Sequence, residues 1–282
     1  MSSSFPSNIQ AARETVASRL KEIRLDAGLT GTELAFRCGW HKSKSSRIEN
    51  AKTPPSDEDI RTWCRACTAE GQTVDLIAAS RNAESLYVEW RRKQRSGLRQ
   101  LQESYVPLYE KTELFRFYTP DMIPGSIQTP EYTRELFKRV IEFNGMNDDF
   151  EAATKARMER STVLRQGNHR FAIILEEAAL QYRFGDRETM ADQLSHLFSA
   201  MSLPNVSLGI IPSTSYRSIW PMAGFYIFDD HLVRSELATA ELTINSPTEV
   251  ATHIKAFNRL QKLAVYGPKA RTLITSAIEA LD

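Results

Sequence analysis

Five basic side chains are concentrated in a short stretch that begins at Arg37 and ends at Lys52. Serines accompany them, and only one acid, Glu49, opposes them. The five are Arg37, Lys42, Lys44, Arg47 and Lys52. Lysine and arginine offer counter-charge to phosphate and hydrogen-bond donors to guanine, while serine can donate or accept. These residue types predict contact with double-stranded DNA; the alternative is a solvated helical bundle with one basic face.

The elements that must hold these side chains are short helices. Residues 13–26 carry apolar side chains at mostly helical spacing, and Gly28 follows as a C-cap. The apolar residues are Val16, Leu20, Ile23 and Leu25. Further along the chain, Pro54 and Pro55 interrupt the pattern, and Ser56 caps a helix that we expect to run to about residue 69.

Two very short helices lie between these longer ones. Thr30 and Glu33 have capping-box spacing, in which each side chain accepts from a free amide at the helix start. Gly39 can adopt the positive φ that closes this helix. A third helix over about 41–50 directs Ile48 inward and most of its basic and serine side chains outward. Two short helices joined by a tight turn, the second one basic, are suited to reading the major groove.

The sequence LTGTELAFRCGWHKSKSSRIENAKTPPS resembles the helix-turn-helix of the phage-repressor and Cro superfamily, the XRE class. The resemblance covers about residues 12–80. Matching positions are Leu29, Thr30, Glu33, Leu34, Ala35, Gly39, Ser43, Arg47, Ile48, Glu49, Asn50 and Pro54. Gly31 stands where the family commonly has a polar residue, often Gln, and Ala51 where it commonly has Gly. The resemblance therefore implies DNA binding without implying a base preference.

By this resemblance, Lys42, Ser43 and Arg47 fall where the family contacts base edges. The positions near phosphates are Thr32, His41, Asn50 and Lys52. With the helix-start residue Thr30 and the outward-facing Lys44, the candidate DNA-binding set is Thr30, Thr32, His41, Lys42, Ser43, Lys44, Arg47, Asn50 and Lys52.

Charge and length divide the chain. Its 282 residues suffice for about two domains, and the net charge of +1 hides an uneven distribution. Residues 1–100 carry 17 basic and 12 acidic residues, whereas residues 101–282 carry 19 and 23. We expect an all-α helix-turn-helix domain of about five helices (1–82), a connecting helix (83–118) and an α+β domain with one small sheet (119–282).

Three cysteines exclude a disulfide framework, and no signal sequence or apolar run of membrane-spanning length is present, so we expect a cytoplasmic protein. Trp63-Cys64-Arg65-Ala66-Cys67 has the spacing of a thioredoxin-type motif but falls inside a predicted helix. Cys38, His41, Cys64 and Cys67 could also be spaced to hold zinc. We favour core packing of the cysteines and predict no metal and no cofactor.

The remaining residues read as alternating helices and strands. Strands are predicted at 171–175 and 206–211, with a hairpin of 224–229 and 232–237 about Asp229-Asp230. Helices are predicted over about 130–142, 148–166, 187–201, 247–265 and 268–281.

Segments such as PGSIQTPEYTRELF, LEEAALQYRFGD, PNVSLGIIP and GFYIFD resemble the domain that follows the helix-turn-helix in WhiJ-type regulators. These are antitoxin-like transcription factors of high-GC Gram-positive bacteria. The loop pattern P-G-L-L-Q-T-x-x-Y is matched by Pro124, Gly125, Gln128, Thr129 and Tyr132. The resemblance covers about residues 100–280 and implies a regulator that often has a small partner protein encoded nearby.

No hydrolase, metalloprotease or nucleotide-binding motif organises the remaining carboxylates and histidines, so we expect no enzyme and no catalytic residue. The candidates are Glu176, Glu177, His169, His196 and His231. A small-molecule or peptide effector could instead lie in a groove formed by the loop 124–132 and nearby aromatics. These are Tyr182, Phe184, Trp220, Phe225, Tyr226 and Phe228, with Trp220 the strongest candidate because its segment reads as a loop.

The favoured hypothesis is a sequence-specific transcriptional regulator whose third helix reads the major groove. Its C-terminal domain would dimerise, sense an effector or bind a partner, and a homodimer is expected because one short helix contacts few base pairs. The alternative is an antitoxin-like interaction module that sequesters a small partner protein, with autoregulatory DNA binding.

Overall fold

The computed structural model describes residues 8–82, 87–89, 97–237 and 240–281. Tertiary contacts divide the chain into two units. The first comprises Met1–Val88 with Leu242–Val250, and the second comprises Glu89–Glu241 with Ala251–Asp282. Within the described residues, no helix combines the length and the apolar character needed to cross a membrane.

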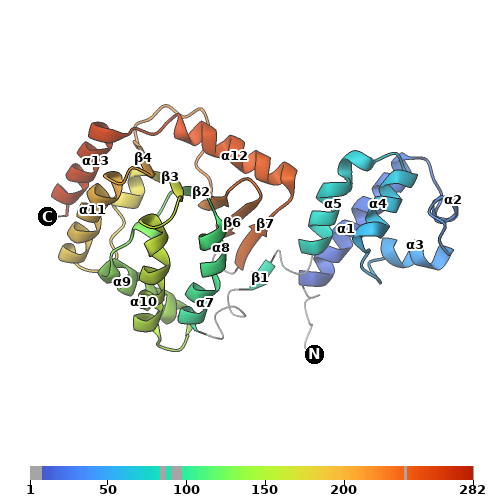
Figure 1. The fold of residues 1–282 in the computed structure, drawn as a ribbon, viewed down its shortest axis with the longest axis horizontal. Helices are drawn as coiled ribbons and strands as arrows, with labels where there is room; N and C mark the ends of the chain where they lie inside the picture. The colour runs from blue at the N-terminus through green and yellow to red at the C-terminus, as the bar shows by residue number, and fades with distance from the viewer. Residues whose placement is uncertain (1–7, 83–86, 90–96, 238–239, 282) are drawn as a thin grey trace. The chain divides into compact units, whose positions relative to one another are not determined.

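Residues 8–82 of the first unit form helices, and the prediction of about five is confirmed (Figure 1). They are α1 (Asn8–Asp26), α2 (Gly31–Arg37), α3 (Lys42–Glu49), α4 (Asp57–Ala66) and α5 (Thr73–Asn82), with a 3₁₀ turn at Glu70–Gln72. Their buried side chains form one core, which includes Val16, Leu20, Ile23, Leu34, Ile48, Ile60 and Trp63.

Leu25 corrects one detail of the predicted apolar stripe on α1. Its side chain is 56% exposed, whereas Leu20 and Ile23 are buried. Leu25 follows Ile23 by two residues, about 200° around the helix, so it faces away from the stripe.

The strands form one mixed sheet in the order β1-β7-β6-β5-β2-β3-β4. Their bounds are β1 (Tyr87–Glu89), β2 (Leu114–Thr119), β3 (Arg170–Glu176), β4 (Val206–Ile211), β5 (Phe225–Phe228), β6 (Leu232–Glu236) and β7 (Ala240–Ile244). β2, β3 and β4 run parallel, and β5 pairs antiparallel with both β2 and β6. The single sheet and the hairpin about Asp229 are thus confirmed. Asp229 turns the hairpin with φ 53°.

Helices pack around this sheet to complete the α+β fold (Figure 1). They are α7 (Leu98–Ser104), α8 (Val106–Lys111), α9 (Pro130–Asn144), α10 (Phe150–Ser161), α11 (Arg187–Met201), α12 (Pro247–Gln261) and α13 (Gly267–Glu279). α10 packs against α7 and α9, and α11 packs against α13 and β4. Aromatic side chains dominate the core beside β2 and β3, where the rings of Phe115 and Phe171 stack 4.4 Å apart.

The expectation of one connecting helix over 83–118 is wrong for the described part of that segment. It contains β1, α7, α8 and most of β2 instead, while 83–86 and 90–96 lie outside the described residues. Gly97 starts α7 with φ 90°, and Thr112 ends α8 in an extended conformation. The sequence LFRFYT that follows forms β2, which lies between β5 and β3 and whose aromatic side chains are buried.

Candidate nucleic-acid interface

The turn between α2 and α3 is defined by its caps. Glu33 N–H donates to Thr30 Oγ1 at 3.2 Å, and Thr30 N–H donates to Glu33 Oε2 at 2.7 Å, so the predicted capping box is confirmed. Hydrogen bonds from the backbone N–H and the side chain of Thr30 lower the pKa of the Glu33 carboxyl. Gly39 has φ 69°, which lets the chain leave α2 and enter α3 within four residues.

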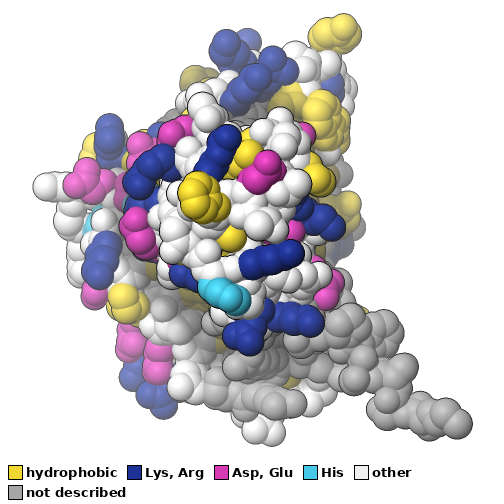
Figure 2. Space-filling view, turned by 90° about the vertical axis from the view of Figure 1, so that its right-hand side faces the viewer, with side chains coloured by type: hydrophobic (Ala, Val, Ile, Leu, Met, Phe, Trp, Pro, Cys, Tyr) yellow, Lys and Arg dark blue, Asp and Glu magenta, His cyan; other side chains and the backbone are white. Residues whose placement is uncertain are grey.

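α3 has one buried face and one exposed face. Ile48 and Ser45 are buried, and the Ser45 hydroxyl donates to the carbonyl of Lys42 at 3.0 Å within the same helix. Lys42 and Arg47 lie on the exposed face. Figure 2 shows lysine and arginine side chains gathered over the α2–α3 end of the first unit. The helix therefore presents its cationic side chains to solvent, as the sequence predicts.

A buried ion pair fixes the C-terminal end of α3. Arg24 Nε lies 2.5 Å from Glu49 Oε1, and the two side chains are only 9% and 13% exposed. A second nitrogen of the same guanidinium donates to the carbonyl of Leu29 at 2.5 Å. α1, the segment before α2 and the end of α3 are thus joined through one arginine, which holds the exposed face of α3 in a set orientation.

Four of the nine predicted site residues make local hydrogen bonds that shape α2 and α3. Thr30 and His41 cap the starts of these helices, and His41 Nδ1 lies 2.8 Å from the hydroxyl of Ser43. Asn50 Nδ2 donates to the carbonyl of Ser46 at 2.7 Å at the end of α3.

Lys44 differs from the other basic residues of this region. Its ammonium lies 2.5 Å from Asp59 Oδ1 and 4.4 Å from the ring centre of Trp40. Asp59 also completes the cap at Ser56. Lys44 thus has a structural partner on α4, so we expect its charge to contribute to DNA affinity less than that of Arg47.

Lys42, Arg47 and Lys52 are exposed cations of this surface. Across the described ranges 8–82, 87–89, 97–237 and 240–281, none of them has a carboxylate oxygen within 4.0 Å. Thr32 is exposed as well. The structure therefore leaves these three positive charges available for an anionic partner at the α2–α3 surface.

The long-range partners of this surface were missed at the level of sequence. Arg24 and Glu49 are separated by 25 residues, and Trp63 donates through Nε1 to the carbonyl of Leu20, 43 residues away. One signal was present: Arg24 directly follows Ile23 on the buried side of α1. A charged residue on a buried helix face needs an oppositely charged or hydrogen-bonding partner, but sequence spacing alone does not identify that partner.

The cysteines belong to the core, as predicted. Cys64 and Cys67 are buried, and Cys38 is half-buried against the same cluster. Burial raises the pKa of both Cys38 and Cys67 to about 11, so these thiols stay protonated near neutral pH. Within the described part of the chain, no group of three or more histidine, cysteine or acidic side chains is placed to hold a metal ion.

Comparison with known families gives two matches. A model described as a helix-turn-helix domain matches residues 15–77. A model described as a domain of unknown function, DUF5753, matches residues 103–276, more than half of the chain. The chain belongs to the DUF5753 family. No curated protein and no solved structure matches it.

The DUF5753 match names no activity, so the helix-turn-helix match carries the functional information. Residues 15–77 therefore form a helix-turn-helix domain, a kind of module that binds DNA. Membership in DUF5753 does not name WhiJ-type regulators, and that resemblance stays a prediction.

Ala51, the second residue after α3, provides a stability test of this domain. Ala51 has φ 52°, a left-handed conformation that costs an L-residue with a Cβ roughly 1–2 kcal/mol. We expect Ala51→Gly to increase the free energy of unfolding by about 1 kcal/mol, seen as a higher urea midpoint at unchanged slope.

Ala78→Gly, within α5, is the matched control for this substitution. It should lower the free energy of unfolding by about 1 kcal/mol because glycine is unfavourable inside a helix. Destabilisation by both substitutions would contradict the assignment of strain to Ala51.

Proposed function

We propose that this chain is a sequence-specific DNA-binding regulator of transcription, with α3 entering the major groove. The observation that carries the proposal is the exposed cationic face of α3, where Arg47 and Lys42 have no acidic partner among the described residues. A protein cation without an internal partner is free to pair with phosphate or with a base edge. The buried pair of Arg24 and Glu49 holds that face in place.

The residues of this surface divide into two groups by the chemistry they offer. Arg47 can donate two parallel hydrogen bonds to guanine, and Lys42 and Ser43 supply further donors at the start of the same helix. Lys52 and Thr32, outside the exposed face of α3, are suited to phosphate contacts. Arg47 would then contribute to base selection, and Lys52 to affinity for any sequence.

Lys52 gives the experiment that tests DNA binding itself. Each phosphate contact steepens the dependence of log K on log salt by about 0.9. We expect Lys52→Ala to weaken binding to all duplexes alike and to reduce this slope by roughly one, as measured by fluorescence anisotropy over a salt series.

Lys21→Ala is the matched control, since Lys21 is an exposed lysine on α1. Lys21→Ala should leave the slope of log K against log salt equal to that of the parent chain. A slope that is unchanged by Lys52→Ala would contradict the phosphate contact of Lys52. No measurable affinity of the parent chain for duplex DNA would contradict the proposal as a whole.

The proposal includes a homodimer, because eight residues of α3 reach only a few base pairs. Two copies would read half-sites about 34–36 Å apart, and a two-fold symmetric binding site would report this arrangement. A small partner protein and an antitoxin-like role stay predictions, tested by co-purification with the product of a neighbouring gene.

We further propose that the DUF5753 domain has no enzymatic activity. The carboxylate of Glu176 accepts a hydrogen bond from Tyr118 at 2.8 Å and is paired with Arg217, so its oxygens are already engaged. Glu177 accepts from the backbone N–H of Ser213 at 2.6 Å. His169 precedes β3 and Glu176 ends it, about 23 Å away at strand spacing. A hydrolytic activity that Glu176→Gln abolishes in a folded protein would contradict this.

A further inference from the structure

The second unit contains a cavity of about 360 Å³, which is within the usual size range of small-molecule sites. Residues of α7, α8, α9 and α10 line it together with residues of β5 and β6 and the loop after β2. Of the aromatics proposed from the sequence, Tyr226 and Phe228 line this cavity, and so do Gly125 and Gln128 of the predicted loop. Trp220, the favoured candidate, does not line it and is 70% exposed.

One side of the cavity is apolar. Leu98 and Leu101 of α7, Phe137 and Val140 of α9, and Met122 contribute to it. These side chains offer hydrocarbon and aromatic contacts to a ligand body without a hydrogen-bonding requirement. A volume of this size equals that of about a dozen water molecules in the liquid, which suits a ligand of roughly ten to fifteen non-hydrogen atoms.

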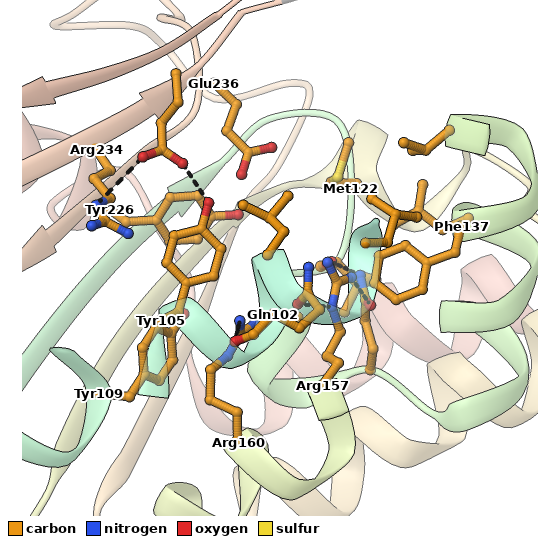
Figure 3. A pocket seen from close by; sticks show the side chains of 18 of the residues that line it. Gln102, Tyr105, Tyr109, Met122, Phe137, Arg157, Arg160, Tyr226, Arg234 and Glu236 are labelled. Carbon is orange, nitrogen blue, oxygen red and sulfur yellow. Dashed lines mark hydrogen bonds and ion pairs between the residues drawn. The ribbon is translucent and has the colours of Figure 1, made fainter. Parts of the chain in front are cut away.

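Two arginines of α10 line the cavity one helical turn apart. Figure 3 shows Arg157 and Arg160 extending from this helix toward Gln102. Arg157 donates to Gln102 Oε1 at 3.1 Å and to Gln128 Oε1 at 2.8 Å, both neutral amide oxygens. Its guanidinium also lies 4.2 Å from the ring centre of Phe137. The charge of Arg157 therefore lies between amides and an aromatic face rather than beside an acid.

Arg160 is buried more deeply and is less well satisfied. Arg160 is 7% exposed. Among the described residues its Nε has no hydrogen-bond partner, and its one hydrogen bond there is 3.4 Å long, to the carbonyl of Gln102. Tyr105 and Tyr109 supply ring contacts to the guanidinium at 5.2 and 4.7 Å. Among the residues that the structure describes, neither Arg157 nor Arg160 has a carboxylate oxygen within 4.0 Å.

The other charges at the cavity neutralise this pair only in part. Arg234 lies 3.6 Å from Glu241, whose other oxygen accepts from Tyr105 at 2.5 Å. With Glu236, the lining holds three arginines and two glutamates, an excess of one positive charge. Burial lowers the pKa of Arg157 to about 10; the charge of Arg160 acts in the same direction, and the charge of Glu236 opposes it.

We propose that this cavity binds a small monocarboxylic acid with an apolar body, its carboxylate between Arg157 and Arg160 and its body against α7 and α9. One negative charge on the ligand matches the excess positive charge of the lining. Its carboxylate oxygens can accept hydrogen bonds from the arginine nitrogens that do not donate to Gln102 or Gln128, Arg160 Nε among them. A cation would meet a lining that already carries an excess of one positive charge. The volume admits such an acid but not a peptide of several residues.

The test uses the full chain and two pairs of matched probes in calorimetric titrations. Octanoate is compared with octan-1-ol, and 4-phenylbutyrate with 4-phenylbutan-1-ol, so that each pair shares its apolar body. We expect each acid to bind about ten- to a hundredfold more tightly than its alcohol, the range of a hydrogen bond to a charged group.

Two substitutions locate the binding. Arg160→Gln should remove most of the preference for the acids, whereas Arg139→Gln, at an exposed arginine of α9, should leave it unchanged. Val140→Trp, at a half-buried position, should weaken binding of acids and alcohols alike by filling the cavity, and it tests the site even if Arg160→Gln does not fold.

Equal affinity for acid and alcohol, or no binding of either acid at about 1 mM, would overturn the proposal. Binding that persists in Val140→Trp would place the ligand elsewhere and would overturn it as well. No DNA enters these titrations, so their outcome is independent of the proposed regulatory function.

Discussion

Replacement of Arg47 by alanine is expected to weaken binding to a preferred duplex by about 1–3 kcal/mol and to relax the preference at one base position. The reason is geometric. Arg47 lies on the exposed face of α3, one position before the buried anchor Ile48, and no acid among the described residues competes for its guanidinium. A bidentate pair with guanine would be lost, whereas contacts to phosphate would remain.

Arg47→Lys separates charge from geometry. Lysine keeps the positive charge but cannot form the planar two-bond contact, so base preference should relax while the salt dependence stays close to that of the parent. Arg65→Ala, at an exposed arginine of α4, is the control for the loss of one charge and should retain the preference. An equal loss of affinity on every duplex in Arg47→Ala would assign this residue to phosphate instead.

Replacement of Arg24 by alanine is expected to lower the free energy of unfolding of the first unit by about 3–5 kcal/mol. The substitution leaves Glu49, 13% exposed, without its cation, and also removes the hydrogen bond to the carbonyl of Leu29. Unfolding in urea can be followed by tryptophan fluorescence, since Trp40 and Trp63 lie 6.0 Å apart in this unit.

The double replacement Arg24→Met with Glu49→Leu gives the control. Removal of both charges leaves no buried ion without a partner, so most of the lost stability should return. DNA affinity measured on folded protein should stay reduced, because the pair also orients the end of α3. Single replacements that each cost less than about 1 kcal/mol would show that the pair is a surface contact in solution.

Local chemistry made the helix-turn-helix predictable. The caps at Thr30, His41 and Ser56 and the left-handed glycine at Gly39 each act within a few residues, so the sequence shows where α2, α3 and α4 begin or end. The contacts that set the orientation of α3 could not be predicted in this way. Lys44 meets Asp59 across 15 residues, and no periodicity links the two positions.

The second unit shows the same limit at larger scale. Buried strands such as β3 and β4 can be predicted because each is an apolar run in the sequence. β2 pairs with β3 across 56 residues, and the sequence pattern wrongly predicts a helix there. The cavity has no sequence signature at all, because its lining comes from helices, strands and a loop that only the fold brings together. From the sequence alone, Arg157 and Arg160 do not differ from the other charged residues of α10; only the structure shows that Arg160 is buried and that both line the cavity.

Selection of duplexes from a random pool is the measurement that tests the central proposal most directly. Full-length parent and Arg47→Ala proteins would each be used to enrich bound duplexes, which are then sequenced. A DNA-reading α3 predicts one enriched motif for the parent and relaxation of that motif at a defined base pair for the variant. Absence of any enriched motif, or the same motif from both proteins, would contradict the assignment of α3 as the reading helix.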